Sequence, residues 1–229
     1  MHKAARAVLA IWHDIQEENW TETIRWYDRE HHIERVGVPG FLSARRFLAI
    51  EGAPRLFIRY ETESVDVLTS AAYLQRANNP TPWTQLSQPT FRDNSRTVCE
   101  ISRRAGGAEG GFAATIRLTP TAPLDVPAAL RWDSLAERLT AISGLLSAEL
   151  WIADSERSVV RTREKELRGV EDDYASVTVV LHGTGEEPIR HALASEIGPA
   201  ITETEWRDPI VGIYRLAFSL DAAAVNAAM

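Results

Sequence analysis

Hydrophobic and polar residues alternate over residues 7–15, the first regular stretch of the chain. Leu9, Ile11 and His13 fall on one side and Val8, Ala10 and Trp12 on the other, a period of two that predicts a β-strand. A helical pattern follows over residues 19–36 and ends before Pro39-Gly40, because proline cannot continue a helix. The first half is completed by predicted strands at 41–50, 55–62 and 96–103 and a predicted helix at 65–77.

This order of elements, β-α-β-β-α-β, is that of a ferredoxin-like unit. Residues 78–94 are rich in Pro, Asn, Thr and Gln, and their lack of periodicity predicts a long irregular loop. The glycine-rich stretch 106–111 has the composition of a linker. We therefore predict a first unit at residues 1–105, a linker at 106–111 and a second unit at 112–229.

The second half repeats the first in a degenerate form. Gly40-Phe41-Leu42-Ser43-Ala44 returns as Gly144-Leu145-Leu146-Ser147-Ala148, and Phe47-Leu48-Ala49 returns at the same offset as Trp151-Ile152-Ala153. Arg92-Asp93 before the last strand of the first half is matched by Arg207-Asp208. Echoes in this order predict a tandem duplication. Each ferredoxin-like unit leaves one sheet face bare, so the two units are expected to form one α+β barrel with helices outside.

Composition narrows the function classes. The net charge of −7 argues against a nucleic-acid partner, since phosphate binding needs a basic surface. The lone cysteine, Cys99, rules out an intrachain disulfide framework and fits a reducing compartment. No apolar run approaches the length of a membrane span, and the N-terminus lacks a signal-peptide pattern, so we expect a cytoplasmic protein without a membrane partner. Nucleotide, serine-hydrolase and zinc-protease motifs are absent.

Several motifs resemble one known family. Tyr27 to His31 preceded by Trp26, then Val38-Pro39-Gly40-Phe41 and Asn79-Pro80-Thr81-Pro82-Trp83, resemble the EthD-like branch of the dimeric α+β barrel superfamily. The resemblance covers residues 7–103 and implies two fused ferredoxin-like βαββαβ repeats packed as an intrachain dimeric α+β barrel. The superfamily holds cofactor-free isomerases, decarboxylases, cyclases, monooxygenases and haem enzymes, so this resemblance implies a fold more narrowly than an activity.

The candidate chemistry lies near the end of the first helix. Tyr27 lies one turn before His31 and Asp28 one turn before His32, so a regular helix turns Tyr27 and His31 toward the sheet and Asp28 and His32 toward solvent. His31 is either a general acid or base or a helix-end histidine that bonds carbonyl groups. No spaced second cluster of ligands accompanies the two histidines, so we expect no metal. The counterpart of this helix in the second half has no histidine, so chemistry is expected only in the first half.

Four further side chains are weighed in the same way. His13 either points into the barrel or lies at its wetted rim. Arg45 and Arg46 alternate on a strand, so one faces the helices, where Glu30 or Glu34 offers a partner, and the other faces the barrel. An arginine in the barrel, together with Arg59 on the neighbouring strand, suits an anionic ligand, and a structural salt bridge is the alternative.

Other segments carry less specific signals. Trp83 either covers a pocket mouth or anchors its own loop. Cys99 is expected to be a small buried side chain. The charge-dense residues 154–173 are predicted to form a solvated, extended hairpin.

The leading hypothesis is a cofactor-independent isomerase, dehydratase or decarboxylase that acts on a small anionic aromatic or polyketide-like compound. Its expected catalytic residues are His31 and His13, and its expected ligand-binding residues are Tyr27, Arg45, Arg46, Arg59 and Trp83. The alternatives are a non-catalytic small-molecule binding or accessory protein and a haem-binding barrel. Association of fused barrels into a homo-oligomer is left open.

Overall fold

The computed structural model describes residues 4–169, 172–201 and 205–228. Its strands close into a single antiparallel barrel with the order β1-β3-β2-β8-β5-β7-β6-β4. The strands are β1 (Ala7–Ile15), β2 (Phe41–Glu51), β3 (Leu56–Thr62), β4 (Phe91–Gly106), β5 (Phe112–Pro120), β6 (Leu145–Ala153), β7 (Val177–Gly183) and β8 (Trp206–Asp221). The predicted α+β barrel is therefore confirmed.

Each half of the chain contributes four neighbouring strands. The first half gives the order β4-β1-β3-β2 and the second gives β8-β5-β7-β6, which is the same arrangement repeated. The two sheets join edge to edge, where β2 pairs with β8 and β4 pairs with β6. The barrel therefore has no free sheet edge in either half, which removes a common route to aggregation. The connection between β4 and β5 spans residues 107–111.

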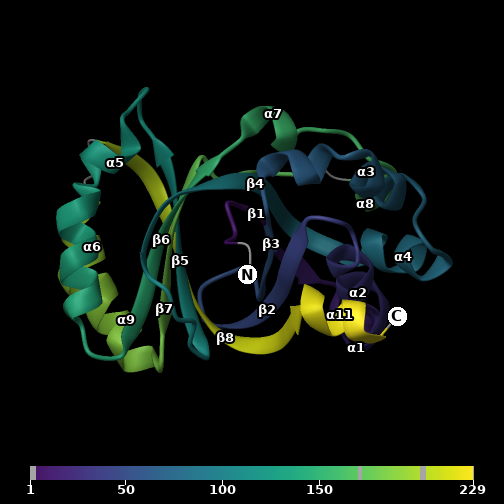
Figure 1. The fold of residues 1–229 in the computed structure, drawn as a ribbon, viewed down its shortest axis with the longest axis horizontal. Helices are drawn as coiled ribbons and strands as arrows, with labels where there is room; N and C mark the ends of the chain where they lie inside the picture. The colour runs from purple at the N-terminus through teal and green to yellow at the C-terminus, as the bar shows by residue number, and fades with distance from the viewer. Residues whose placement is uncertain (1–3, 170–171, 202–204, 229) are drawn as a thin grey trace.

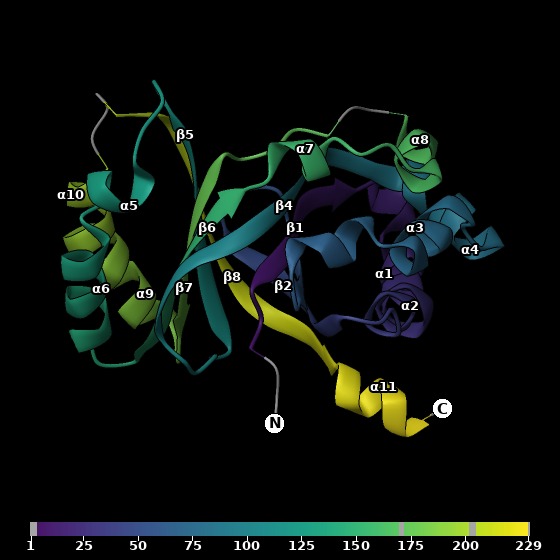
Figure 2. The ribbon, with the colours of Figure 1, turned by 45° about the horizontal axis from the view of Figure 1, so that its top comes forward.

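Helices cover the outside of the barrel in two layers (Figure 1). The first half supplies α1 (Trp20–Trp26), α2 (His32–Val36), α3 (Ala71–Asn78) and α4 (Pro82–Ser87). The second half supplies α5 (Val126–Ala129), α6 (Trp132–Ala141), α7 (Ser155–Ser158), α8 (Arg163–Arg168), α9 (Glu186–Ala192), α10 (Gly198–Ala200) and α11 (Ala222–Ala228). Figure 2 shows that α8 and α11, although they come from the second half, lie with the helices of the first half.

Side chains pack into three apolar clusters. One fills the barrel interior and includes Trp12, Phe47, Phe57 and Trp151. The other two lie between the sheet and the helices, one in each half. Cys99 is buried in the interior cluster, as expected, and burial raises the pKa of its thiol well above the usual range.

Two segments differ from the sequence prediction. Residues 78–94 are not an irregular loop, because Thr81 caps α4 by accepting a hydrogen bond from the backbone N–H of Thr84 at 3.0 Å, and Pro82 starts the helix. Residues 154–173 are not a solvated hairpin, because α7 and α8 fold against the first half. Among the described residues, no helix is both long and apolar enough to cross a membrane.

Candidate functional site

Polar side chains gather between the outer face of the first-half sheet and the helix that follows β1. His13 is fully buried there. Both expectations for His13 were wrong, because Val8, Ala10 and Trp12 take the interior side of β1 and leave Leu9, Ile11 and His13 facing the helices. His13 therefore lies neither in the barrel nor at its rim, but beneath the first helix.

A π-helical turn at Tyr27–His31 interrupts this helix between α1 and α2. The wider turn inserts residues relative to a regular α-helix and so changes which side chains face the sheet. His31 is 6% exposed and His32 is fully buried, so both histidines lie inside the layer. The prediction that His32 faces solvent is wrong, and the reason is the local change of helical period.

His13 and Tyr27 form a hydrogen-bonded pair with defined roles. The Nδ1 atom of His13 lies 3.0 Å from the carbonyl oxygen of Asp14, which only accepts, so Nδ1 carries the proton. Burial lowers the pKa of His13 to about 3, so the ring is neutral and its Nε2 atom is an acceptor. The hydroxyl of Tyr27 therefore donates to Nε2 at 2.9 Å. This pair fixes both rings beside Phe91, which stacks on His13 at 4.0 Å between centroids.

His31 and His32 each keep one ring nitrogen unused. The Nδ1 atom of His32 bonds to the hydroxyl of Tyr60 at 2.8 Å. Its Nε2 atom and the Nδ1 atom of His31 are buried and have no hydrogen-bond partner among the described residues. Buried polar atoms normally have a partner, because an unmade hydrogen bond costs about 1–3 kcal/mol. Two neighbouring imidazoles therefore each present an unpartnered nitrogen inside this layer, beside unpartnered guanidinium nitrogens of Arg35, Arg46 and Arg168.

Three arginines surround the histidines. Arg35 pairs with Glu164 of α8, and Arg46 donates to Asp28 at 2.6 Å. Arg168, also on α8, donates to both carboxylate oxygens of Asp172 at 3.0 Å. The helix α8 from the second half thus completes a site built mainly by the first half.

Burial and these charges keep the imidazoles neutral. Burial, followed by the charges of Arg35 and other neighbours, lowers the pKa of His31 well below its usual range. Burial and then Arg46 do the same for His32. Burial raises the pKa of Tyr27, so its phenol also stays neutral. The layer therefore combines neutral proton acceptors with nearby fixed positive charge.

The expected site residues separate into two places. His13, Tyr27, His31 and Arg46 come together in the helix–sheet layer. Arg46 lies 5.9 Å from the centre of the Tyr27 ring, and it pairs with Asp28 rather than with Glu30 or Glu34.

Arg45 and Arg59 lie on the opposite side of the sheet. Both pair with Glu109 near one end of the barrel, and Arg59 is fully buried and also lies 3.3 Å from Nε2 of His182. Trp83 packs at the outside, where the guanidinium of Arg25 lies 5.6 Å from its ring, which fits an anchor of the α3–α4 segment. These three side chains do not join the histidine cluster.

Sequence reasoning missed His32, Tyr60, Arg35, Glu164 and Arg168. Glu164 and Arg168 could have been recognised as a pair, because they are four residues apart and so share one face of a helix. Tyr60 lies opposite Ala44 on β2. It is two residues after Ile58 on β3, so both side chains face the helices. Only the π-helical turn, which periodicity does not reveal, accounts for His32.

The equivalent layer of the second half has a different character. The buried side chains of its helices α6 and α9 are all apolar, and they include Trp132, Leu135 and Leu139 of α6. His182, the buried histidine of that half, points into the barrel beside Arg59. The polar layer is thus a property of the first half alone.

The buried histidines predict an acid-sensitive fold. His13 and His182 have native pKa values of about 3 through burial, whereas an unfolded chain holds them near the ordinary value of about 6.5. The unfolded state therefore binds more protons as pH falls below 6.5, and stability present above that pH is lost progressively toward pH 3. We expect the urea midpoint to fall between pH 7.5 and pH 5. A His13→Gln variant should show a shallower decline, and His191→Gln, at an exposed position, should not. A midpoint that stays constant over this range contradicts the neutral, buried assignment.

Comparison with known proteins identifies the fold. No family model and no curated protein matches the sequence. The structure is similar to an anthrone oxidase-like protein, with a TM-score of 0.61, 13% identity, and coverage of 95% of this chain and 93% of the other. It is also similar to a candidate monooxygenase from Fusobacterium nucleatum, with a TM-score of 0.58, 9% identity and coverage of 95% and 97%. A candidate chlorite dismutase gives a TM-score of 0.55 at 9% identity and coverage of 99% and 100%.

These likenesses define a class of fold. The closed antiparallel barrel with two outer helical layers is the dimeric α+β barrel fold, here within one chain. Identities of this size establish the fold alone.

Haem does not fit the site. Its residues are in mutual contact: the ring of His31 lies 4.2 Å from that of Trp26, and His32 has Tyr27 and Phe218 at 4.9 and 4.6 Å. The described residues around the two histidines therefore leave no flat slot for a porphyrin.

Proposed function

We propose that the protein is a small-molecule enzyme that transfers protons without a bound cofactor. Its site is the helix–sheet layer of the first half, and its substrate is a small anionic compound of aromatic or polyketide type. The observation that supports this most strongly is the pair of buried imidazole nitrogens, on His31 and His32, that lack partners among the described residues. A ligand with hydrogen-bonding groups supplies the partners that these atoms lack.

The chemistry follows from neutral imidazoles beside fixed cations. The free nitrogen of His31 removes a proton from the carbon next to a substrate carbonyl, and the electron pair of that C–H bond moves toward the carbonyl oxygen. The positive charges of Arg46 and Arg168 stabilise the negative charge that develops there. The proton then returns from His31 to another carbon in an isomerisation.

A dehydration shares the same first step: the electron pair then expels the hydroxyl group on the neighbouring carbon, and that group leaves as water after His31 gives it the proton. In a decarboxylation of a β-keto acid no C–H bond is broken. The C–C bond to the carboxylate breaks, carbon dioxide leaves, the electron pair moves toward the ketone oxygen, where Arg46 and Arg168 stabilise the charge, and the enolate then takes a proton from water. The pair formed by His13 and Tyr27 positions the substrate, because the hydroxyl of Tyr27 still accepts a hydrogen bond after it donates to His13.

Turnover of a compound panel tests this proposal. The panel contains β-keto acids, phenolic carboxylates and their enol forms, and proton exchange in D₂O is followed by NMR. We expect at least one compound to react, and His31→Ala to lower kcat/KM by about 10²-fold or more, the usual contribution of a general base. His13→Ala should also lower it, whereas His191→Ala, on the exposed side of α9, should not. Full turnover by both site variants would remove the assignment.

A non-catalytic binding or accessory protein is the alternative from another functional class. It predicts a compound that stays bound through purification and is released unchanged, which native mass spectrometry detects. The enzyme proposal instead predicts that the compound is converted.

We further propose that the chain is a tandem duplication related to the EthD-like branch, with halves at 1–105 and 112–229. Backbone geometry at repeated positions supports it. Gly40 and its counterpart Gly144 have φ values of +92° and +86°, and Asp93 and its counterpart Asp208 have φ values of +50° and +39°. Such values are uncommon for an aspartate, so their recurrence at matching positions favours a common ancestor for the two halves.

A further inference from the structure

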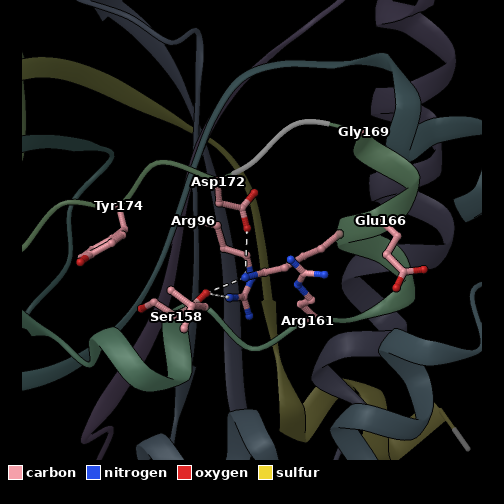
Figure 3. Close-up of a pocket in the computed structure, with 9 residues that line it drawn as sticks. Arg96, Ser158, Arg161, Glu166, Gly169, Asp172 and Tyr174 are labelled. Atoms are coloured by element: carbon pink, nitrogen blue, oxygen red, sulfur yellow. Dashed lines mark hydrogen bonds and ion pairs between the residues drawn. The ribbon is translucent and has the colours of Figure 1, made fainter.

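A pocket of about 410 Å³ lies apart from the histidine layer, between α7 and α8. Figure 3 shows Arg96 of β4 at its centre, with Ser158 of α7 on one side and Arg161 and α8 on the other. The pocket therefore combines a strand of the first half with the segment of the second half that folds over it. None of its residues has a place in the proton-transfer proposal.

The pocket floor carries an arginine that has no acidic partner in the described part of the chain. Arg96 is 7% exposed and so more than nine-tenths buried. Its guanidinium donates to the hydroxyl of Tyr73 at 3.1 Å and to the carbonyl oxygen of Ser158 at 3.5 Å. No carboxylate pairs with it among the described residues. A buried guanidinium held only by neutral acceptors favours an additional anion.

The pocket wall carries Lys165 and Asp172, and positive charge exceeds negative charge there. Lys165 donates to the carbonyl oxygen of Ser158 at 2.6 Å and lies 3.2 Å from Asp172. Asp172 also pairs with Arg168 behind the wall, so Lys165 shares this carboxylate with a second cation, whereas Arg96 pairs with none among the described residues. Burial and then Arg96 lower the pKa of Lys165 to about 8, which is consistent with two cations held close together.

The rim of the pocket has one positive and one negative charge, and it also has apolar side chains that are exposed to solvent. Arg161 and Glu166 line the rim on the α8 side, with one charge of each sign. Val159 is 62% exposed and Tyr174 is 40% exposed, and both line the same pocket. A ligand that fits has an anionic head for the floor and an apolar body for the rim.

We propose that this pocket binds a small organic carboxylate, with the carboxylate between Arg96 and Lys165 and the apolar body against Val159 and Tyr174. The planar guanidinium of Arg96 matches the two oxygens of a carboxylate, and the ammonium of Lys165 adds a second charged donor. This site is independent of the proposed catalytic layer. Its test is binding, so its failure is distinguishable from a failure of turnover.

Isothermal titration with benzoate and hexanoate tests the site, with benzamide as a neutral match and inorganic phosphate as an anion without an apolar body. We expect at least one of the two carboxylates to bind the full chain and benzamide not to bind. Lys165→Met should weaken carboxylate binding by about tenfold or more, because a charge-assisted hydrogen bond is lost. Arg96→Gln should weaken it similarly, and Val159→Ser should weaken hexanoate more than phosphate.

Arg163→Met is the matched control on α8, because Arg163 is exposed and does not line the pocket. It should bind as the native chain does. If Arg96→Gln does not fold, Lys165→Met and Val159→Ser still decide the result. Three outcomes overturn the proposal: neither carboxylate binds at millimolar concentration, Lys165→Met binds as tightly as the native chain, or phosphate alone binds.

Discussion

Replacing Glu164 with alanine is expected to lower the free energy of unfolding by about 3–5 kcal/mol, because it leaves the charge of Arg35 buried without a partner. Arg35 is 2% exposed and Glu164 is 8% exposed. Burial by itself lowers the pKa of Arg35. The carboxylate of Glu164 has the opposite effect, and the pKa of Arg35 lies above its usual range. The loss is large against the typical total of about 5–15 kcal/mol for a domain. Equilibrium unfolding in urea measures it.

Two further variants isolate the cause. Glu166→Ala, on the same helix, removes an exposed ion pair with Arg163 and should change stability by no more than about 0.5 kcal/mol. The double variant Arg35→Met/Glu164→Leu removes both buried charges and should recover most of the lost stability. An ordinary substitution changes the free energy of unfolding by about 1 kcal/mol. If Glu164→Ala lowers it by no more than that, α8 does not dock through this pair.

Replacing Trp12 with alanine should cost about 3–5 kcal/mol, the usual loss for a large aromatic side chain in a core. Trp12 is fully buried in the barrel and stacks on Phe57 with ring centroids 5.1 Å apart. Its Nε1 atom donates to Thr115 of β5 at 3.2 Å, so the side chain links the two halves across the interior. Urea unfolding followed by tryptophan fluorescence and by far-UV circular dichroism measures the loss.

Trp12→Phe keeps much of the ring and should lose less stability than the alanine variant. Leu86→Ala, at a side chain that is 75% exposed, should lose almost none. Because the barrel interior is shared, the two probes should report one coincident transition in every variant. Two separate transitions, or a Trp12→Ala protein as stable as Leu86→Ala, would contradict a common core.

The fold was largely predictable because its signals are local and repeated. Alternation over residues 7–15 predicted β1, which spans Ala7–Ile15 in the structure. The repeat around Gly40 and Gly144 predicted that two similar units share one barrel, and the strand order confirms the barrel. The charge-dense segment 154–173 was misread, because Glu164 pairs with buried Arg35 and Arg168 donates to buried Gln88, both on distant parts of the chain. Charge content alone does not distinguish a solvated segment from one that pairs its charges inside.

The candidate site was predicted only in part. Sequence reasoning placed His31 and Tyr27 on the sheet side of their helix, and both are buried there. For His13 it weighed only the barrel interior and the barrel rim, whereas His13 lies on the face of β1 that the first helix covers. It also assumed a regular helix, so the inward turn of His32 followed from no pattern in the sequence. Arg45 and Arg59 were grouped with the histidines by strand position, although the sheet separates them.

The histidine layer of the first half is where we expect the substrate to bind and react. Side-chain ¹⁵N NMR of the histidines tests this most directly, in the native chain, with an unreactive analogue of the panel compound that reacts fastest. We expect the signals of His31 and His32 to shift on binding, and the signal of His182, which is buried inside the barrel, to stay unchanged. Shifts confined to His182, with His31 and His32 unchanged, would contradict it.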